Sequence, residues 1–160
     1  MKTNYLFPNQ FKKIGWIIMI PSAILGFFVL FFDFEITLLD LKAFTIYSEG
    51  MSFFSGNPTT FFGLISNNLT NEITGILFLI GAIFTAFSKE EFEDEFIVNL
   101  RLESLLWATY INYAILVLCI LFFYDLSFLY VLILNMFTTL IFFIVRFNYK
   151  LYLAKKNIEK

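Results

Sequence analysis

The chain has 160 residues, of which 59% are hydrophobic and only 15% are charged. Soluble domains average about 45–50% and about 25% for these two classes, so the composition excludes an ordinary soluble domain and indicates an integral membrane protein. The chain has no His and a single Cys, which excludes imidazole metal ligands, a histidine general base and a disulfide within the chain. The formal net charge of −2 identifies no partner, because the charges are segregated along the sequence.

The first apolar run covers residues 14–32 and follows Lys12 and Lys13. Its length is close to the roughly 20 residues that a helix needs to cross a hydrocarbon core about 30 Å thick. The run ends without the small-residue cleavage pattern of a signal peptide, so we expect a permanent first span. We expect a kink at Pro21, because proline has no N–H to donate to the carbonyl one turn back.

Residues 33–71 form the longest segment that does not span, and we expect it to be partly ordered. Alternating side chains in residues 34–38 and β-forming side chains in residues 43–47 predict two short strands that turn at residues 39–40. The apolar residues within 61–65 predict a short helix that lies in the membrane interface.

Three further apolar runs, at residues 72–88, 104–124 and 127–146, complete an all-α transmembrane fold, a four-helix membrane bundle. The short link between the last two runs makes them antiparallel neighbours. With both termini inside, the cytoplasmic segments hold all of the 11 Lys and Arg residues except Lys42. This excess predicts that both termini, including a basic tail at 147–160, lie in the cytoplasm. The many Phe, Ile, Asn and Lys residues are typical of an AT-rich bacterial genome, so we expect the bacterial inner membrane.

Small and polar residues indicate where the spans contact one another. Small residues near one face of the second span favour close approach of a neighbouring helix, and they are Gly75, Ala82 and Ala86. Polar residues of the last two spans favour interhelical hydrogen bonds, and they are Tyr110, Asn112, Tyr113, Asn135, Thr138 and Thr139. Counting from the helix ends places Asn112 at the depth of Thr138 and Thr139. A transport path would use the same residues, but no acid, Lys or Arg lies near mid-membrane, where proton-coupled transporters need one.

The acidic stretch, residues 88–103, separates the second and third spans. It holds six of the chain's 13 acidic residues: Glu90, Glu91, Glu93, Asp94, Glu95 and Glu103. We expect a cytoplasmic helix extension over residues 89–103 that is capped by Ser88 and continuous with the third span, because no Gly or Pro interrupts residues 90–123. Its apolar face comprises Phe92, Phe96, Leu100 and Ile97.

Four interpretations of these carboxylates stay open: a solvated helix end, docking against the basic tail and Lys12 with Lys13, a surface for a basic partner, and a divalent-cation site. No metal site is predicted, because successive helical carboxylates point in different directions; the nearest candidate ligands are Glu90, Glu91, Asp94 and Glu95. The candidate interaction residues are Glu90, Glu93, Asp94, Glu95, Arg101, Glu103 and Arg146. Since Glu103 and Arg146 both lie at the cytoplasmic border of antiparallel spans, we predict an ion pair between them, with separate snorkelling to headgroups as the alternative.

The run from residue 87 to residue 113 resembles a family of small four-span membrane proteins from Bacteroidetes-type bacteria. The matching residues are Phe87, Ser88, Lys89, Glu90, Glu93, Asp94, Glu95, Ile97, Arg101, Ser104 and Leu105. Glu91 stands where the family pattern has a basic residue, which puts an alternating-charge role in doubt. The resemblance implies a cell-envelope location and a small helix-turn-helix regulator as a neighbour or partner. It implies no activity.

The sequence favours a non-enzymatic multi-pass membrane protein whose acidic cytoplasmic face binds or regulates a partner. It contains no G-x-S-x-G, H-E-x-x-H or nucleotide-binding glycine loop. A small transporter or channel subunit and a lipid-active enzyme that uses carboxylates are the alternatives. We expect no cofactor and no direct binding of nucleic acid. The expected partners are the lipid bilayer, a basic cytoplasmic protein and a second copy of the chain.

Overall fold

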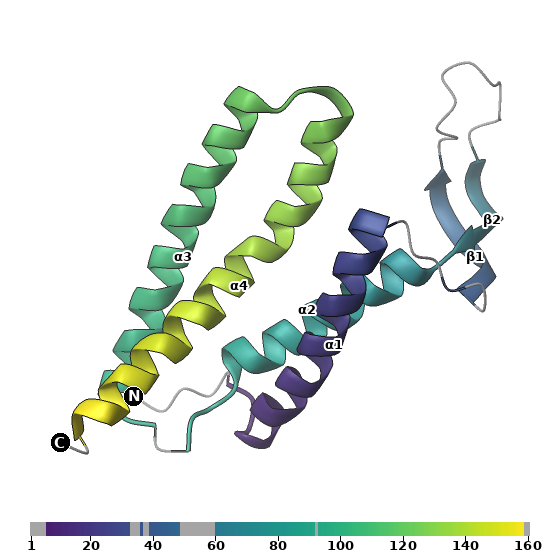
Figure 1. The fold of residues 1–160 in the computed structure, drawn as a ribbon. Coiled ribbons are helices and arrows are strands. Elements are labelled where there is room, and N and C mark those ends of the chain that lie inside the picture. Colours follow the sequence, from purple (N-terminus) through teal and green to yellow (C-terminus); the bar gives the residue numbers. More distant parts are fainter. Residues whose placement is uncertain (1–5, 33–35, 37–38, 49–59, 92, 159–160) are drawn as a thin grey trace. The chain divides into compact units, whose positions relative to one another are not determined.

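The computed structural model describes the chain except for residues 1–5, 33–35, 37–38, 49–59, 92 and 159–160. Its elements in chain order (Figure 1) are α1 (Gln10–Phe32), β1 (Asp40–Ser48), β2 (Thr60–Asn68), α2 (Thr70–Phe87), α3 (Glu95–Phe122) and α4 (Asp125–Ile158). In the part that the structure describes, four helices are long and apolar enough to cross a membrane. The prediction of four apolar helices is therefore confirmed, and a two-stranded sheet accompanies them.

The helices differ from the predicted spans mainly at their ends. α1 begins four residues before the predicted start at residue 14, and α4 continues through most of the predicted basic tail to Ile158. The 34 residues of α4 make a helix about 51 Å long, against a hydrocarbon core of about 30 Å. Hydropathy marks the part of a helix that suits lipid, whereas backbone hydrogen bonding continues until the helix is capped. Pro21 lies inside α1, and the kink expected there stays a prediction.

The predicted helix extension over residues 89–103 is wrong in its first part. α3 begins at Glu95, and Asp94 is its N-cap, with the carboxylate accepting a 2.8 Å hydrogen bond from the Ile97 N–H. Ser88 caps no helix N-terminus, because its hydroxyl donates to the Phe84 carbonyl at the end of α2. Asp and Ser are about equally good N-caps, so local preference did not decide between the two positions. Phe92, expected on the apolar face of this extension, lies outside the described residues.

The chain forms two compact units, one of residues 1–20 with 78–160 and one of residues 21–77. In the first unit, the early turns of α1 meet the late turns of α2 at two glycines. A Cβ added to Gly15 would lie 2.6 Å from the Thr85 nitrogen and 2.8 Å from the Gly81 oxygen. Ala82 and Ala86 are buried there as predicted, but the closest contact is made by Gly15 and Gly81, which the predicted stripe omitted.

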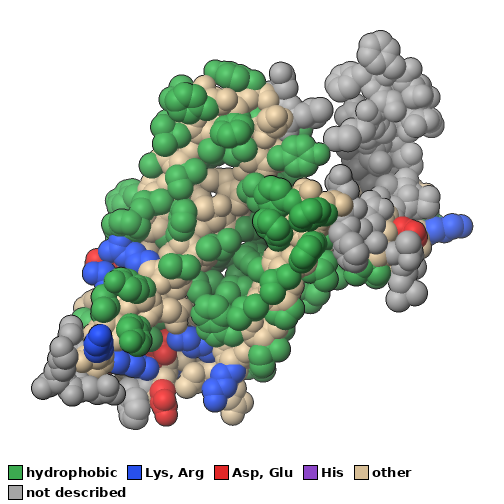
Figure 2. All heavy atoms as spheres, in the orientation of Figure 1, with side chains coloured by type: hydrophobic (Ala, Val, Ile, Leu, Met, Phe, Trp, Pro, Cys, Tyr) green, Lys and Arg blue, Asp and Glu red, His purple; other side chains and the backbone are tan. Residues whose placement is uncertain are grey.

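The core of the first unit is formed by α2, the first half of α3 and the second half of α4. Its fully buried members include Phe143 and Phe147 of α4 and Ala108 of α3. α3 and α4 run side by side as an antiparallel pair (Figure 1). Only 11% of the most apolar window of each of these two helices is buried. Their outward faces are therefore covered by apolar side chains, as Figure 2 shows, which suits contact with lipid.

The second unit contains an antiparallel hairpin, as expected for the outer segment, but its strands are not the two predicted ones. Residues 43–47 lie in β1 as predicted, whereas the other predicted strand, residues 34–38, lies largely outside the described residues. β1 pairs with β2 from Asp40 opposite Asn68 to Ser48 opposite Thr60. The predicted turn at residues 39–40 is wrong, because that position starts β1, and the predicted helix at residues 61–65 is wrong, because those residues belong to β2. A short apolar run fits the hydrophobic period of a helix or of a strand, and pairing with β1 decided for the strand.

Candidate functional site

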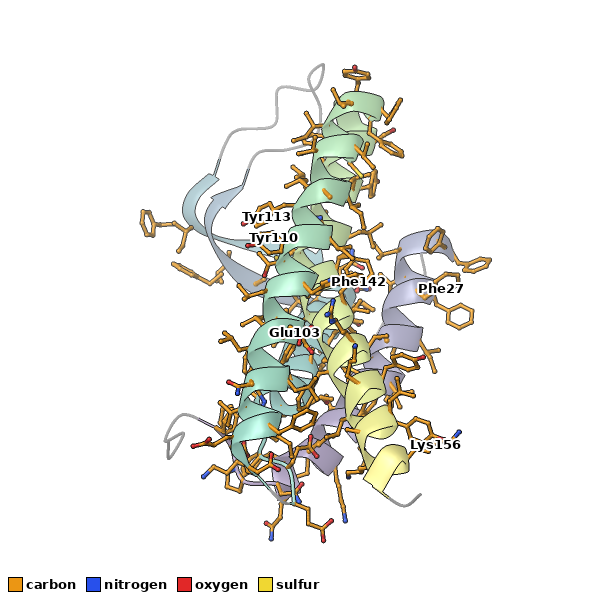
Figure 3. The ribbon with its side chains drawn as sticks, turned by 90° about the vertical axis from the view of Figure 1, so that its left-hand side faces the viewer. Phe27, Glu103, Tyr110, Tyr113, Phe142 and Lys156 are labelled. Carbon is orange, nitrogen blue, oxygen red and sulfur yellow. The ribbon has the colours of Figure 1, made fainter. Side chains whose placement is uncertain are left out.

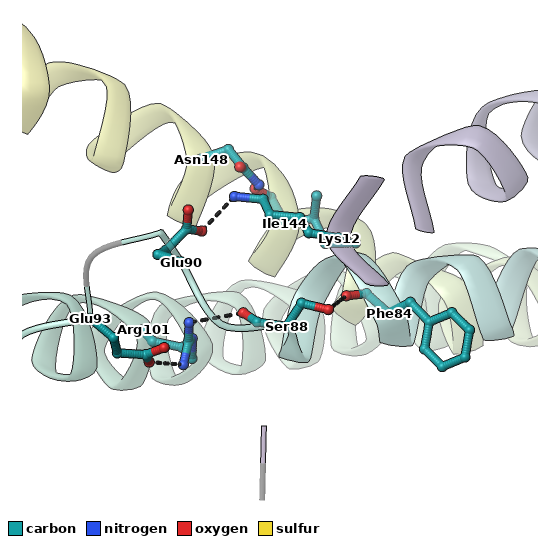
Figure 4. Close-up of polar contacts among 8 residues, drawn as sticks. All are labelled: Lys12, Phe84, Ser88, Glu90, Glu93, Arg101, Ile144 and Asn148. Carbon is teal, nitrogen blue, oxygen red and sulfur yellow. Dashed lines mark hydrogen bonds and ion pairs between the residues drawn. The ribbon is translucent and has the colours of Figure 1, made fainter. Parts of the chain in front are cut away.

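The candidate functional site lies at the charged end of the first unit, where α1 and α3 begin and α2 and α4 end. We call Lys12, Ser88, Glu90, Glu93 and Arg101 the charged cluster (Figure 4). They come from the first turn of α1, the connection between α2 and α3, and the second turn of α3. The acidic stretch therefore does not project as a free helix, and part of it is folded against its own chain.

The segment before α1 is the first part of this arrangement. The Phe7 N–H donates to the Phe87 carbonyl at 3.0 Å, and the Lys89 N–H donates to the Phe7 carbonyl at 2.8 Å. The Phe7 ring also packs edge-on to Phe84, with 5.2 Å between centroids. These bonds set the N-terminal segment beside the start of the acidic stretch. This contact was not predicted from the sequence, where the local signal for it is a pair of aromatic residues, Phe7 and Phe11, ahead of the first apolar run.

Lys12 and Glu90 form the first ion pair of the charged cluster. Both side chains are largely buried, at 16% and 9% exposed. The Lys12 ammonium also lies 5.8 Å from the centroid of the Phe147 ring of α4. The predicted docking of the acidic stretch against the N-terminal lysines is thus present for Lys12, whereas Lys13 is exposed.

Arg101 and Glu93 form the second ion pair and lie deeper in the protein. Arg101 Nη1 donates to Glu93 Oε1 at 2.7 Å, and Nη2 donates to the Ser88 carbonyl at 3.1 Å. The guanidinium carbon lies 5.2 Å from the centroid of Phe147. Burying two charges costs several kcal/mol per ion unless each finds good partners. The carbonyl and the ring supply such partners to Arg101, so this pair determines how α3 meets the end of α2.

Within the part of the chain that the structure describes, three buried polar atoms of this pair and its neighbour have no hydrogen-bond partner: Glu93 Oε2, Arg101 Nε and Ser104 Oγ. Ser104 is fully buried and lies one turn after Arg101 on α3. Leaving a polar atom unpaired costs about 1–3 kcal/mol. The hydrogen bonds within the charged cluster therefore do not satisfy all of its buried polar atoms.

The predicted ion pair between Glu103 and Arg146 is present. Arg146 Nη2 lies 2.8 Å from Glu103 Oε1, and the guanidinium carbon lies 4.2 Å from the centroid of the Trp107 ring. Glu103 is 64% exposed, so solvent screens much of this attraction. Figure 3 shows Glu103 nearer the charged end of α3 than Tyr110 and Tyr113, as expected for a residue at the border of a span.

The other candidate interaction residues, together with the candidate metal ligand Glu91, divide into two groups. Glu90, Glu93 and Arg101 are engaged in ion pairs, and the Asp94 carboxylate caps α3. Glu91 and Glu95 are exposed. Among the described residues, no group of three or more Cys, Asp and Glu side chains is placed to hold a metal ion. The structure therefore does not bring Glu90, Glu91, Asp94 and Glu95 together as a ligand set.

The expected polar contact between the last two spans is present with a different partner. Asn112 and Asn135 exchange two amide hydrogen bonds, at 3.1 and 3.4 Å. Asn112 therefore lies at the depth of Asn135 and not at that of Thr138 and Thr139. The Thr138 hydroxyl donates to the Leu134 carbonyl of its own helix, and Tyr110 and Tyr113 are exposed. The two asparagines that a transport path would use are thus hydrogen-bonded to each other.

No family model, curated protein or solved structure matches the chain. The site therefore has to be interpreted from its own geometry. Its buried ion pairs join the N-terminal segment, the α2–α3 connection and α3, and both cations contact Phe147 of α4. Chemically, this arrangement neutralises Glu90 and Glu93 internally and leaves Glu91, Asp94 and Glu95 exposed beside them, with Asp94 engaged as the N-cap of α3.

Proposed function

We propose that the protein is a non-enzymatic multi-pass protein of the bacterial inner membrane whose acidic cytoplasmic face binds or regulates a basic partner. Four long apolar helices support the membrane location. The placement of all Lys and Arg residues except Lys42 within residues 1–13, 89–101 and 146–160 supports a cytoplasmic location for both termini. In the first unit, α1 begins at the same end at which α4 finishes, because Lys12 and Phe147 are in contact, and this agrees with that topology.

The observation that carries the proposal is that some acidic side chains of this stretch are paired inside the protein and others are exposed. Glu90 and Glu93 are internally paired, and these pairs hold the connection on which Glu91 lies and the helix that begins at Glu95. The exposed carboxylates of Glu91 and Glu95 are therefore displayed next to residues that ion pairs hold against the rest of the unit. A surface that is ordered before binding loses less conformational entropy when a partner binds. A basic cytoplasmic protein has the charge that such a surface attracts.

The test compares two neutralising variants in the full-length protein. A photo-crosslinking residue at position 91 first captures the partner, which is identified, purified and titrated against the reconstituted protein. Each exposed ion pair contributes about 0.2–1 kcal/mol, so Glu91→Gln with Glu95→Gln should weaken binding by up to about 30-fold. Raising the ionic strength should weaken binding by the wild type more than binding by this variant.

Glu72→Gln is the control, because it removes one carboxylate, as each of the two changes does, but from the first turn of α2. That turn lies on the opposite side of the membrane in the proposed topology. The control should bind like the wild type. Equal affinity of the double variant and the control, with both folded as judged by helix content and elution, would contradict the proposal. Capture of a partner that is acidic would contradict it as well.

A further inference from the structure

A groove lies on the outer face of α4, beside α3 and close to the charged end. It has a volume of about 440 Å³ and is lined by Trp107, Phe142, Val145, Arg146, Tyr149 and Lys150. Five of these residues lie on α4 at the spacings that place side chains on one helix face, and Trp107 of α3 forms the other wall. The lining holds two cations and no carboxylate.

The groove changes from apolar to charged along its length. Phe142 and Lys150 are eight positions apart, which is about 12 Å along a helix axis. Val145 and Phe142 line the end towards the middle of α4, and Arg146 and Lys150 line the end towards its charged terminus. Trp and Tyr side chains such as Trp107 and Tyr149 concentrate at the level of lipid headgroups. A ligand that fits this groove has a long apolar part and an anionic head.

The electrostatic balance of the groove favours one negative charge. Arg146 uses one nitrogen on Glu103 and presents its face to Trp107, and its guanidinium carries five N–H donors in all. Lys150 is exposed and supplies an ammonium with three donors. Two cations thus face one carboxylate, which itself is mostly in solvent. The remaining positive charge matches a phosphodiester monoanion.

We propose that this groove is a binding site for an anionic phospholipid. The phosphate lies between Lys150 and Arg146, and an acyl chain follows Val145 and Phe142 against the Trp107 ring. A zwitterionic lipid binds less well, because its own ammonium competes with Lys150 for the phosphate. The site is independent of the proposed partner surface, since it uses neither Glu91 nor Glu95.

Trp107 allows the lipid to be detected directly. The chain has two tryptophans, so Trp16→Phe leaves Trp107 as the sole fluorophore. The full-length variant is reconstituted in phosphatidylcholine vesicles that contain phosphatidylglycerol, with bromine on the acyl chains of one lipid or of the other. At equal mole fractions, brominated phosphatidylglycerol should quench Trp107 more strongly than brominated phosphatidylcholine. We expect an apparent binding preference of about fivefold, because one Lys near an anionic lipid contributes about 1 kcal/mol.

Lys150→Gln should abolish this preference. Lys156→Gln is the matched control, because Lys156 is also exposed on α4 and lies outside the groove. Equal quenching by the two brominated lipids would overturn the proposal. Equal effects of the two Lys variants would also overturn it, because they indicate general surface charge. Quenching relieved only by diluting the protein in the vesicle would indicate a second copy in the groove and refute the lipid site.

A second measurement uses the protein with both tryptophans in place, in case Trp16→Phe does not fold. Native mass spectrometry of the protein released from membranes that contain both lipids should show retained phosphatidylglycerol on the wild type and on Lys156→Gln. The same measurement should show it reduced about fivefold on Lys150→Gln. Equal retention by all three proteins would refute the site.

Discussion

The contact between Gly15 of α1 and Gly81 of α2 gives the sharpest prediction about stability. We expect Gly15→Ala to destabilise the protein, because the added Cβ would lie 2.5 Å from Thr85 Oγ1, 2.6 Å from the Thr85 nitrogen and 2.8 Å from the Gly81 oxygen. A hydroxyl can rotate away, but two of these three atoms belong to the backbone of α2. The helices must therefore separate locally.

The size of the effect follows from these distances. Carbon atoms in contact with other heavy atoms normally lie about 3.5–4.0 Å apart, so the two helices must separate by roughly 1 Å. The side chains around the contact are tightly packed, since Ala82, Thr85 and Ala86 are all at most 1% exposed. Overpacking of this kind costs about 1–3 kcal/mol, and an intrinsic helix preference of up to about 1 kcal/mol for Ala over Gly offsets part of it. We expect a net loss of about 1–2 kcal/mol, which lowers the ratio of folded to unfolded protein by about 5-fold to 30-fold.

The assay is the free energy of unfolding in bicelles or mixed micelles, with Gly26→Ala as the matched control on the same helix. Among the described residues, a Cβ at Gly26 meets only Thr74 Cγ2, at 3.5 Å, which is ordinary contact. The control should therefore be neutral or more stable by about 0.4–1 kcal/mol. Gly81→Ala should also destabilise, because its Cβ would lie 2.7 Å from the Met19 nitrogen. Combined with Gly15→Ala, it should cost less than the sum of the two, since the helices have already separated.

Two results would refute this reasoning. One is a Gly15→Ala protein as stable as the Gly26→Ala control, which would mean that the two helices do not meet at these glycines. The other is strict additivity of Gly15→Ala and Gly81→Ala, which would place the two glycines in separate environments.

Three further predictions use the same measurement. Arg101→Met should lower the free energy of unfolding by about 3–5 kcal/mol, because it leaves Glu93 buried without its ion-pair partner. The double variant with Glu93→Met should recover most of that loss. A double variant no more stable than the single one would contradict the pairing. Asp94→Ala should lower the free energy of unfolding by about 1 kcal/mol, because it removes the N-cap of α3. Asp94→Asn should change it by no more than a few tenths of a kcal/mol, since Asn is an equally good N-cap. Equal losses for the two variants would show that the cap is not responsible. Asn112→Ala and Asn135→Ala should each cost about 0.6–1.7 kcal/mol, and the double variant should cost no more than the larger single loss, which additive losses would contradict.

Much of the fold could be predicted because the criterion for a membrane span is local. A run of about 20 apolar residues identifies a span wherever it occurs. The Glu103–Arg146 ion pair could be predicted for a related reason. Once α3 and α4 were known to be antiparallel with a short link, equal distances from that link placed both charges at the same border.

The predictions failed where a segment could form either of two local structures of similar energy. Residues 61–65 suit a helix or a strand, and the register with β1 decides for the strand. Ser88 and Asp94 are both good N-caps, and the charged cluster decides in favour of Asp94, because Ser88 is needed at the end of α2. For residues 61–65 the deciding contact comes from another segment, β1, whereas the Ser88 hydroxyl is taken by a carbonyl only four residues earlier in the chain.

By itself, the sequence determined that four helices suit a membrane and that the charges concentrate at their ends, because burial in lipid depends on the composition of each segment alone. Only the tertiary structure decided which acid meets which cation. The ion pair of Lys12 with Glu90 joins residues 78 positions apart, and it leaves Glu91 in solvent although the two acids are neighbours in the chain. Composition shows how many charges a segment carries, but packing of one helix against another decides which of those charges are exposed.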